Sequence, residues 1–369
     1  MTNIAEKIRI RKLPPVWFIR GINAIRSALL ILNRKMFPAN VVLYEYFQYF
    51  WLLPCIRVAA ELNIAGLLKK CPLTLGELSE KTGSHADSLG RMLRALAGCG
   101  IFRQRKDGRY SNTSLSKVLI DGKGSLRYMI LHHLGPVNWN LFSQLSHKVK
   151  TGEDVFLKVY SKHIYEYLAE DKNESFLFDR SMTDLSEMAV EPMLSVYNFS
   201  DASTVADIGG GEGILLSSIL YNYKNLKGIL FDLPEAMVQS SAILEKYGVS
   251  DRTTVIPGSF FDKVPTGADL YLLKNIVHNW SDDDCLKILK MVRDVLPDHG
   301  KIILVEMVIE EDNRPSFGKL IDVQMMVVMR DGRERTRKEF NKLLQNAGLK
   351  LNRVIPTIAP FSLIEAVKQ

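Results

Sequence analysis

The sequence predicts an α/β protein with a Rossmann-like, doubly wound sheet in its C-terminal half and a mainly helical N-terminal half that contains a winged-helix pattern. Three observations predict this fold class. Short apolar runs alternate with helical patterns from residue 204 onward. A glycine-rich turn separates the first apolar run from the first of these helices. Residues 73–120 have the order helix, turn, helix, hairpin.

Composition limits the class of protein. The 369 residues are 47% apolar and 24% charged, which is typical of a globular protein with a large core. The net charge of +7 is concentrated in residues 1–40, which hold eight bases and one acid, so the remaining residues carry 40 of each sign. This distribution argues against a general nucleic-acid surface. Four scattered cysteines and the lack of a recognisable signal peptide favour a reducing, cytoplasmic location.

Residues 1–40 are expected to form an N-terminal extension that contains one amphipathic helix. Apolar side chains recur at helical spacing and form a single stripe, made of Phe18, Ile22, Ile25, Leu29, Leu32 and Met36. The favoured interpretation is a helix packed on the body or on a second subunit. The alternative is a basic helix in peripheral contact with an anionic membrane. No apolar run reaches about 18 residues, so no membrane span is predicted.

Residues 41–190 are expected to form the helical domain. The segment 41–70 is apolar on all sides of a helix, which predicts burial, with a position between subunits as the favoured interpretation. Thr74 and Glu77 have capping-box spacing, and a second helix is expected from about Asp87 to Ala97. Lys106-Asp107-Gly108 is a hairpin turn signal. The second helix offers only two arginines to DNA, so a dimerisation or scaffold module is the favoured interpretation.

Residues 191–369 are expected to form the sheet domain. Strands are predicted at 204–208, 228–232, 253–257, 269–273, 301–306 and near 350–355. Glycines 209, 210, 211 and 213 let the backbone come close to a ligand at a helix N-terminus. Asp232 closes the second strand, where an acid can accept both hydroxyls of a ribose. Asp207, directly before the glycines, suits an ammonium group better than a pyrophosphate. The pattern therefore predicts a nucleoside-containing cofactor.

Two polar residues follow other strands of the same sheet. His278 lies just beyond the strand that ends at Leu273, and Glu306 closes the strand 301–306. The carboxyl ends of neighbouring parallel strands meet at the ligand edge of the sheet. A neutral histidine can take a proton near pH 7, and a carboxylate on its other nitrogen fixes its tautomer. We therefore expect an acid–base site here.

These residues carry a family resemblance through several segments in order: Asp207–Gly213, Asp232-Leu233-Pro234, Gly258–Phe261, Lys274–Asp282, Val305-Glu306 and Gly332–Thr336. Together they resemble the caffeate/acetylserotonin-type, S-adenosylmethionine-dependent O-methyltransferases that act on small molecules. The resemblance covers about residues 41–369. It implies a class I methyltransferase fold, a homodimer assembled through the N-terminal domain, S-adenosylmethionine as cofactor with S-adenosylhomocysteine as product, and a role in secondary metabolism.

The resemblance also implies roles for individual residues. His278 would be the general base, with Glu306 and Glu334 as flanking carboxylates. The expected cofactor-binding residues are Asp207, Gly209, Gly211, Asp232, Leu233, Ser259, Phe260 and Lys274. The expected substrate-pocket residues are Met182, Asn279, Trp280 and Met325. Ser259 and Asn279 depart from the aspartates that many plant members have there.

The implied reaction is methyl transfer to a hydroxyl, expected to be phenolic, of a small molecule, without a metal ion. Asp282-Asp283-Asp284 is better explained as the acidic first turn of a helix than as a magnesium site. Three alternatives remain: a nicotinamide-dependent oxidoreductase, a non-enzymatic winged-helix regulator, and a family member with other S-adenosylmethionine chemistry, such as decarboxylation or cyclisation.

Overall fold

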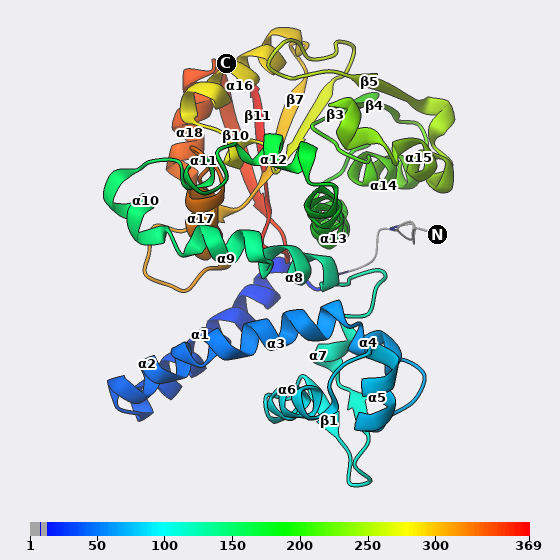
Figure 1. Ribbon diagram of the computed structural model, residues 1–369. Helices are drawn as coiled ribbons and strands as arrows, with labels where there is room; N and C mark the ends of the chain where they lie inside the picture. The colour runs from blue at the N-terminus through cyan, green and yellow to red at the C-terminus, as the bar shows by residue number, and fades with distance from the viewer. Residues whose placement is uncertain (1–7, 9–12) are drawn as a thin grey trace. The chain divides into compact units, whose positions relative to one another are not determined.

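The computed structural model describes residue 8 and residues 13–369 (Figure 1). The chain divides into two compact units. The sheet unit contains the residues up to Ser27, Leu141–Glu170 and Ser186–Gln369, and the helical unit contains Ala28–Asn140 and Asp171–Leu185. This division differs from the expected continuous ranges 41–190 and 191–369, because Leu141–Glu170 belong to the sheet unit. The long helix α13 (Lys172–Val196) begins in one unit and ends in the other.

The sheet has seven strands in the order β10-β11-β7-β6-β3-β4-β5. Their bounds are β3 Thr204–Ile208, β4 Lys227–Asp232, β5 Thr253–Pro257, β6 Leu270–Lys274, β7 Lys301–Glu306, β10 Leu349–Pro356 and β11 Ser362–Lys368. The five strands from β7 to β5 run parallel, and β10 and β11 are antiparallel additions. The chain order reverses between β3 and β6, which is the position where such sheets bind ligands.

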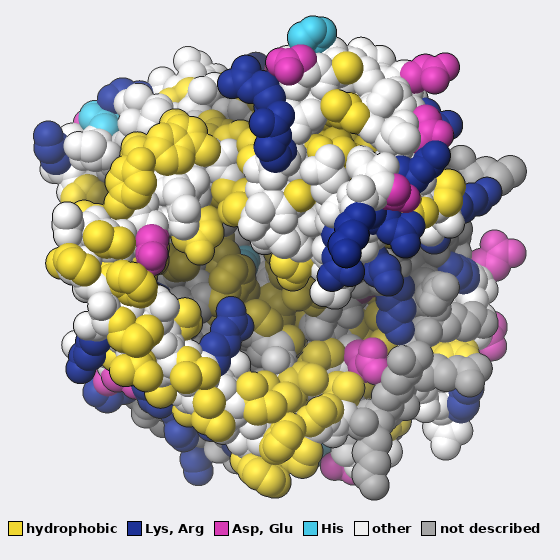
Figure 2. All heavy atoms as spheres, turned by 90° about the horizontal axis from the view of Figure 1, so that it is seen from below, with side chains coloured by type: hydrophobic (Ala, Val, Ile, Leu, Met, Phe, Trp, Pro, Cys, Tyr) yellow, Lys and Arg dark blue, Asp and Glu magenta, His cyan; other side chains and the backbone are white. Residues whose placement is uncertain are grey.

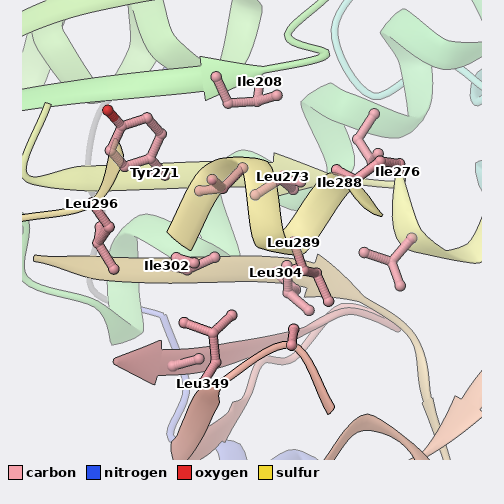
Figure 3. Close-up of a cluster of buried hydrophobic side chains, with 14 of the residues drawn as sticks. Ile208, Tyr271, Leu273, Ile276, Ile288, Leu289, Leu296, Ile302, Leu304 and Leu349 are labelled. Carbon is pink, nitrogen blue, oxygen red and sulfur yellow. The ribbon is translucent and has the colours of Figure 1, made fainter. Parts of the chain in front are cut away.

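Helices cover both faces of this sheet, as the doubly wound prediction requires (Figure 1). The helix α14 (Ile214–Asn222) packs on β3, β4 and α15 (Ser240–Tyr247). On the other face, α16 (Asp282–Val295) and α18 (Arg337–Asn346) share one apolar core with the strands. Figure 3 shows this core, to which Tyr271 and Leu273 of β6, Ile288 of α16 and Leu304 of β7 contribute. The core fixes the strand ends that carry the polar residues described below.

Several smaller elements complete the sheet unit. The helices α10 (Leu145–Thr151), α11 (Val155–Tyr160) and α12 (Ile164–Glu170) precede the sheet in sequence. The helix α17 (Phe317–Val328) follows β7, and the short strands β8 (Val308–Ile309) and β9 (Arg335–Thr336) pair in parallel. Three 3₁₀ turns are η1 (Pro234–Met237), η2 (Ser250–Arg252) and η3 (Val277–Asn279). The turn η3 lies between β6 and α16 and carries His278.

The helical unit confirms the winged-helix pattern. Thr74 and Glu77 form the capping box that begins α5 (Leu75–Thr82), and α6 (Ala86–Gly98) follows. The strands β1 (Phe102–Gln104) and β2 (Tyr110–Asn112) form the predicted hairpin. The other helices are α2 (Ala39–Phe47), α3 (Tyr49–Glu61), α4 (Ile64–Leu67), α7 (Ser114–Lys117), α8 (Arg127–His133) and, at the boundary, α9 (Pro136–Phe142). Their apolar faces form a separate core.

The strand β11 was not predicted, because its short apolar run is interrupted by Glu365, a buried carboxylate paired with Arg353 and Tyr197. The predicted burial of the segment 41–70 is not met for its first half within the single chain, since the large side chains of α2 and early α3 are exposed, and burial between subunits stays a prediction. These exposed residues include Leu43, Tyr44, Phe47, Tyr49, Phe50 and Trp51. Helical periodicity identifies an apolar surface but not the molecule that covers it.

The predicted N-terminal helix is confirmed as α1 (Val16–Met36), and no residue of it is buried. The basic residues Arg9, Arg11 and Lys12 lie outside the described residues. Among the described residues, α1 alone is long and apolar enough to meet the length and composition criterion for crossing a membrane. The same criterion is met by core helices of soluble proteins and by signal sequences. Figure 2 shows one face of the molecule, on which hydrophobic side chains occupy large areas.

Candidate functional site

The glycine turn after β3 is held against β4 and β6. Gly209, Gly211 and Gly213 all have positive φ angles, which residues with a Cβ adopt only at a cost. A Cβ added to Gly209 would lie 2.4 Å from Ile276 Cδ1, and one added to Gly210 would lie 2.5 Å from Leu230 Cδ1. The glycines are therefore required by the packing as well as by the backbone conformation. They leave the helix N-terminus of α14 accessible to a close-lying ligand.

Two carboxylates flank this turn. Asp232, at the end of β4, accepts hydrogen bonds from the backbone nitrogens of Gly211 and Leu233, both at 2.7 Å. Asp207 is buried, and neither of its carboxylate oxygens has a hydrogen-bond partner among the described residues. Burial raises the pKa of Asp207 to about 7; Lys274 opposes this shift and Asp232 adds to it. A buried, unpaired carboxylate of this kind is costly unless a cationic ligand group reaches it.

The neighbouring strand β6 ends at Lys274, and the residue that follows it, Asn275, has a strained backbone conformation. Burial lowers the pKa of Lys274, and Asp207 and Glu306 oppose the shift. The backbone of Asn275 has a φ of 55°, in the left-handed region, and the side chain of this residue is buried. Asn275 N donates to Val305 O, and its own carbonyl accepts from the Asn279 side chain. These bonds turn the chain sharply, so that His278 follows within four residues of the strand end.

His278 lies between two buried carboxylates. Its Nδ1 is 2.9 Å from Glu334 Oε1 and 3.6 Å from Glu306 Oε2. Glu306 Oε1 accepts from the backbone nitrogens of Ile276 and Val277 at 3.0 and 2.8 Å. Glu334 is held by its backbone nitrogen, which donates to Asp322 Oδ1 on α17. The turn η3, the end of β7 and the residue directly before β9 therefore converge on one imidazole.

The charges of this cluster are coupled. Burial by itself would lower the pKa of His278, but Glu306 and Glu334 more than reverse this, so that the pKa lies above its ordinary value. Burial raises the pKa of Glu306 to about 7, while His278 acts to lower it and Glu334 to raise it. The three groups also form the single cluster, within the part of the chain that the structure describes, whose ligand atoms lie close enough to hold a metal ion. As arranged, the two carboxylates instead stabilise an imidazolium.

Aromatic side chains border the turn. Phe260 lies 3.6 Å from the Cβ position of Gly209 and makes an edge contact with Trp280. Trp280 also contacts Phe261, and its ring is stacked with that of Tyr165 of α12, with 6.3 Å between the ring centroids. Ser259 Oγ accepts from Phe261 N, so it shapes this loop. The result is an aromatic border beside the glycines, on the same unit as the acid–base cluster.

Comparisons with known proteins decide the family. Residues 142–350 match the family model for the O-methyltransferase domain, and residues 44–122 match the one for the O-methyltransferase dimerisation domain. The chain belongs to this O-methyltransferase family. The dimerisation match supports a homodimer. The methyltransferase is 34% identical over 330 residues to phenazine O-methyltransferase PhzM of Lysobacter antibioticus, covering 89% of this chain and 96% of the relative.

Other relatives agree. Mitomycin biosynthesis 6-O-methyltransferase of Streptomyces lavendulae is 32% identical, with 89% of this chain and 94% of that protein covered. The crystal structure of LaPhzM superposes with a TM-score of 0.85 at 34% identity, covering 90% of this chain and all of the other. The structure of CalO1 with S-adenosylhomocysteine has a TM-score of 0.80 at 31% identity, with 90% and 98% covered. The protein is thus an S-adenosylmethionine-dependent O-methyltransferase, and the oxidoreductase and regulator alternatives are set aside.

The residues of the methyltransferase fit this cofactor. The unpartnered oxygens of Asp207 suit the ammonium of its amino-acid part, as the sequence suggested. Asp232 has lone pairs left for a ribose after its two backbone bonds. Gly209, Gly211, Leu233, Ser259, Phe260 and Lys274 lie on the same turn or on the loops and strand ends beside it. Their individual contacts with the cofactor remain predictions.

The predicted pocket residues divide between the units. Trp280, Asn279 and Met325 lie on the sheet unit, where Asn279 bonds to the Asn275 carbonyl and Met325 is buried on α17. Met182 lies on the part of α13 that belongs to the helical unit. Two residues near the cluster were missed. Tyr165 has no sequence signal, whereas Arg335, a basic residue directly after Glu334, could have been noticed as a charge expected to need a buried partner.

Proposed function

We propose that this methyltransferase methylates a phenolic hydroxyl of a small aromatic acceptor, with His278 as general base and Glu306 and Glu334 as its flanking carboxylates. The observation that carries the proposal is the 2.9 Å contact between His278 Nδ1 and Glu334 Oε1. When Nδ1–H donates to Glu334, Nε2 is left without a proton and can accept one. A phenol with a pKa of about 10 is mostly protonated at neutral pH and needs such a base.

The proton follows a short route. The O–H bond of the acceptor breaks, and its proton goes to Nε2 of His278. The imidazolium that forms is stabilised by Glu334 and Glu306, which are 2.9 and 3.6 Å from Nδ1. Bound S-adenosylmethionine supplies an electrophilic methyl group on a sulfonium. Asp207, Asp232, Phe260 and Lys274 hold and orient it under this proposal, and the fixed alignment supplies much of the rate.

Relatives indicate the class of acceptor. Their names include a phenazine O-methyltransferase and a 2,7-dihydroxy-5-methyl-1-naphthoate 7-O-methyltransferase. One neighbour, NcsB1, was solved with 2-hydroxy-5-methyl naphthoic acid and, separately, with 1,4-dihydroxy-2-naphthoic acid. The aromatic border formed by Trp280 and Tyr165 suits a flat ring. We therefore propose a fused or substituted aromatic acceptor of secondary metabolism, in a cytoplasmic enzyme, with Asn279, Trp280 and Met325 of the sheet unit lining its pocket.

A screen with methyl-labelled cofactor tests this function. The panel begins with the two naphthoic acids above and extends to simple phenols and hydroxylated isoprenoids, each measured with and without a chelator. Labelled methyl ethers from phenols, unaffected by the chelator, support the proposal. Because one relative is an N,N-dimethyltransferase, aminoarenes form a second arm. Transfer to amines alone, or decarboxylated or cyclised products, contradicts it.

We also propose that a second copy of the chain covers the exposed apolar surface of α1, α2 and α3. This surface comprises the α1 stripe (Phe18, Ile22, Ile25, Leu29, Leu32 and Met36) and the aromatic residues of α2 and early α3 (Tyr44, Tyr46, Phe47, Tyr49, Phe50 and Trp51), all exposed. The dimerisation match begins at residue 44, within α2, so α1 and the first part of α2 directly precede it. Such a surface is too apolar to remain in water.

A membrane is the competing occupant, because α1 carries Arg20, Arg26, Arg34 and Lys35 and no acid. Leu29→Glu with Leu32→Glu separates the two, with Arg26→Gln and Arg34→Gln as matched variants. The second copy is supported if the glutamate variant forms weaker dimers in sedimentation experiments. It also requires that neither variant, nor the parent protein, binds phosphatidylglycerol vesicles. Dimers unchanged by the glutamates, with vesicle binding lost in both variants, contradict it.

A further inference from the structure

Three consecutive residues, Arg333–Arg335, contact the segment that carries the base, and the last of them begins the strand β9. Arg333 N donates to His278 O at 2.8 Å, and Glu334 Oε1 lies 2.9 Å from the imidazole. Arg335 then contacts the backbone on either side of His278. The residues 277–282 are called the base segment below.

Arg335 is one of the largest fully buried side chains of the protein, with 1% exposure. Its Nη1 donates to Val277 O at 2.9 Å, and its Nη2 donates to Trp280 O at 3.1 Å. Its Nε and Nη2 both bond to Asp282 Oδ1, at 3.0 and 2.7 Å. One planar guanidinium therefore joins the residue before His278, the second residue after it and the first residue of α16.

This arrangement uses properties that only arginine has. The guanidinium offers five donors in a rigid fork, whereas a lysine ammonium is a compact point charge on a flexible stem. Val277 begins the 3₁₀ turn η3 and Trp280 is its C-terminal cap, and within the turn the Val277 carbonyl receives only a long bond, 3.5 Å, from Trp280 N. Besides Arg335 and this long bond, both carbonyls are approached by Cys285 Sγ, a weak donor that lies 3.2 Å from Val277 O and 3.6 Å from Trp280 O.

The pairing of β9 with β8 also relates the positions of Glu306 and Glu334 to each other. Arg335 pairs with Val308 in the short parallel ladder between β9 and β8, and Val308 follows Glu306 by two residues. Glu334 and Glu306 are thus brought to one imidazole by the register of a single strand pair. A shift of β9 would therefore displace both Glu334 and the base segment, and it would change the distance between Glu334 Oε1 and His278 Nδ1.

We propose that Arg335 is a positioning residue of the methyl transfer reaction, which fixes the base segment so that His278 Nδ1 stays on Glu334 and Nε2 faces the acceptor proton. This inference rests on the proposed role of His278. It assigns Arg335 no contact with substrate or cofactor. Its effect is to hold a reactive geometry, and displacement by about 1 Å can reduce a rate about 100-fold.

The test compares Arg335→Met and Arg335→Lys with Arg252→Met in the full-length enzyme. Arg252 is a suitable control, because its guanidinium likewise donates to backbone carbonyls, those of Leu220, Tyr223 and Leu226, but from η2, directly before β5. Asp282→Ala is a second probe of the same link. The Asp282 side chain is 62% exposed, so its removal leaves the core unchanged.

Three readouts are taken for each variant. Calorimetry gives the affinity for S-adenosylhomocysteine, and proton NMR follows the His278 Nδ1–H resonance, which needs no acceptor. The pH dependence of kcat is measured with the best phenol of the screen. For Arg335→Met we expect loss or broadening of the Nδ1–H resonance and affinity within about threefold. We also expect kcat to fall about 100-fold at neutral pH and to recover as the pH approaches about 10, where the phenol ionises without help.

Arg335→Lys should give a smaller loss and Asp282→Ala a smaller one still, while Arg252→Met keeps the wild-type profile and resonance. If Arg335→Met does not fold, Asp282→Ala and Arg335→Lys decide by the same readouts. A wild-type resonance and pH profile in the folded Arg335 and Asp282 variants would overturn the inference. An active His278→Gln enzyme would instead overturn the proposed base, so the two failures are distinguishable.

Discussion

The strand ends of the sheet unit and the N-terminal helices both reverse the usual distribution of side chains in proteins, but in opposite ways. At the strand ends, charged groups are buried: Asp207, Glu306 and Glu334 have at most 1% exposure. On α1, α2 and early α3, large apolar groups are exposed, with Trp17 at 73% and Leu43 at 71%. Both departures are costly in an isolated chain. Each therefore indicates a region that is completed by another molecule.

The two regions differ in how they are held. The strand ends are fixed by a large core and by backbone bonds, such as those from Ile276 and Val277 to Glu306. The α1 helix has no buried residue. A site for chemistry must be rigid before its ligand arrives, whereas a surface for assembly can acquire order from its partner. This comparison predicts that substitutions at the strand ends affect rate or cofactor affinity, and that substitutions on α1–α3 affect assembly.

The largest effect is expected at His278. His278→Gln should reduce kcat by about 10²–10⁴-fold, because a general base of this kind contributes a factor of that size. S-adenosylhomocysteine affinity should stay within a few-fold, since Gln keeps the size of the side chain. Steady-state kinetics and calorimetry measure both quantities. Wild-type turnover would remove His278 from the mechanism.

Asp232 should give the next largest effect, on cofactor binding. Asp232→Ala removes the proposed acceptor of two ribose hydroxyls and the partner of Gly211 N and Leu233 N. Unpaired groups of this kind cost roughly 1–3 kcal/mol each. Calorimetry with S-adenosylhomocysteine should therefore show clearly weaker binding, with Asp262→Ala, which removes an exposed acid that follows the neighbouring strand β5, as control. Equal affinities for the two variants would show that Asp232 does not serve the cofactor.

A smaller effect is expected on assembly. Phe47→Ser and Trp51→Ser remove rings that contact each other at 4.9 Å on the exposed surface. They should shift the monomer–dimer equilibrium toward monomer, because burying a large apolar side chain contributes about 1.5–3 kcal/mol. Sedimentation velocity measures the shift, and S-adenosylhomocysteine affinity serves as the control. An unchanged dimer would mean that this surface is covered by something other than the second copy.

The sequence predicted most of the fold because periodicity and glycine placement are local signals. The strands β3 to β7 and the hairpin after α6 appeared where expected. For the site, His278 and Glu306 could be joined because both follow parallel strands. Glu334 came only through the resemblance, since it directly precedes β9, a strand of two residues with no pattern of its own. The role of Arg335 depends on two carbonyls, one in a 3₁₀ turn and one at its C-terminal cap, which no spacing in the sequence reveals. The molecule that covers the apolar surface of α1–α3 is not part of the single chain, so the sequence does not identify it.

The most direct test of the central claim, that His278 removes the acceptor proton, is the pH dependence of methyl transfer to a phenol by wild-type and His278→Gln enzymes. Only the neutral imidazole accepts a proton, and Glu306 and Glu334 raise its pKa above the ordinary 6.5. The wild-type rate should therefore fall tenfold per unit at pH values below a midpoint above 6.5. His278→Gln should lack this midpoint and rise toward the phenol pKa of about 10. The same acid midpoint in both enzymes would contradict the account.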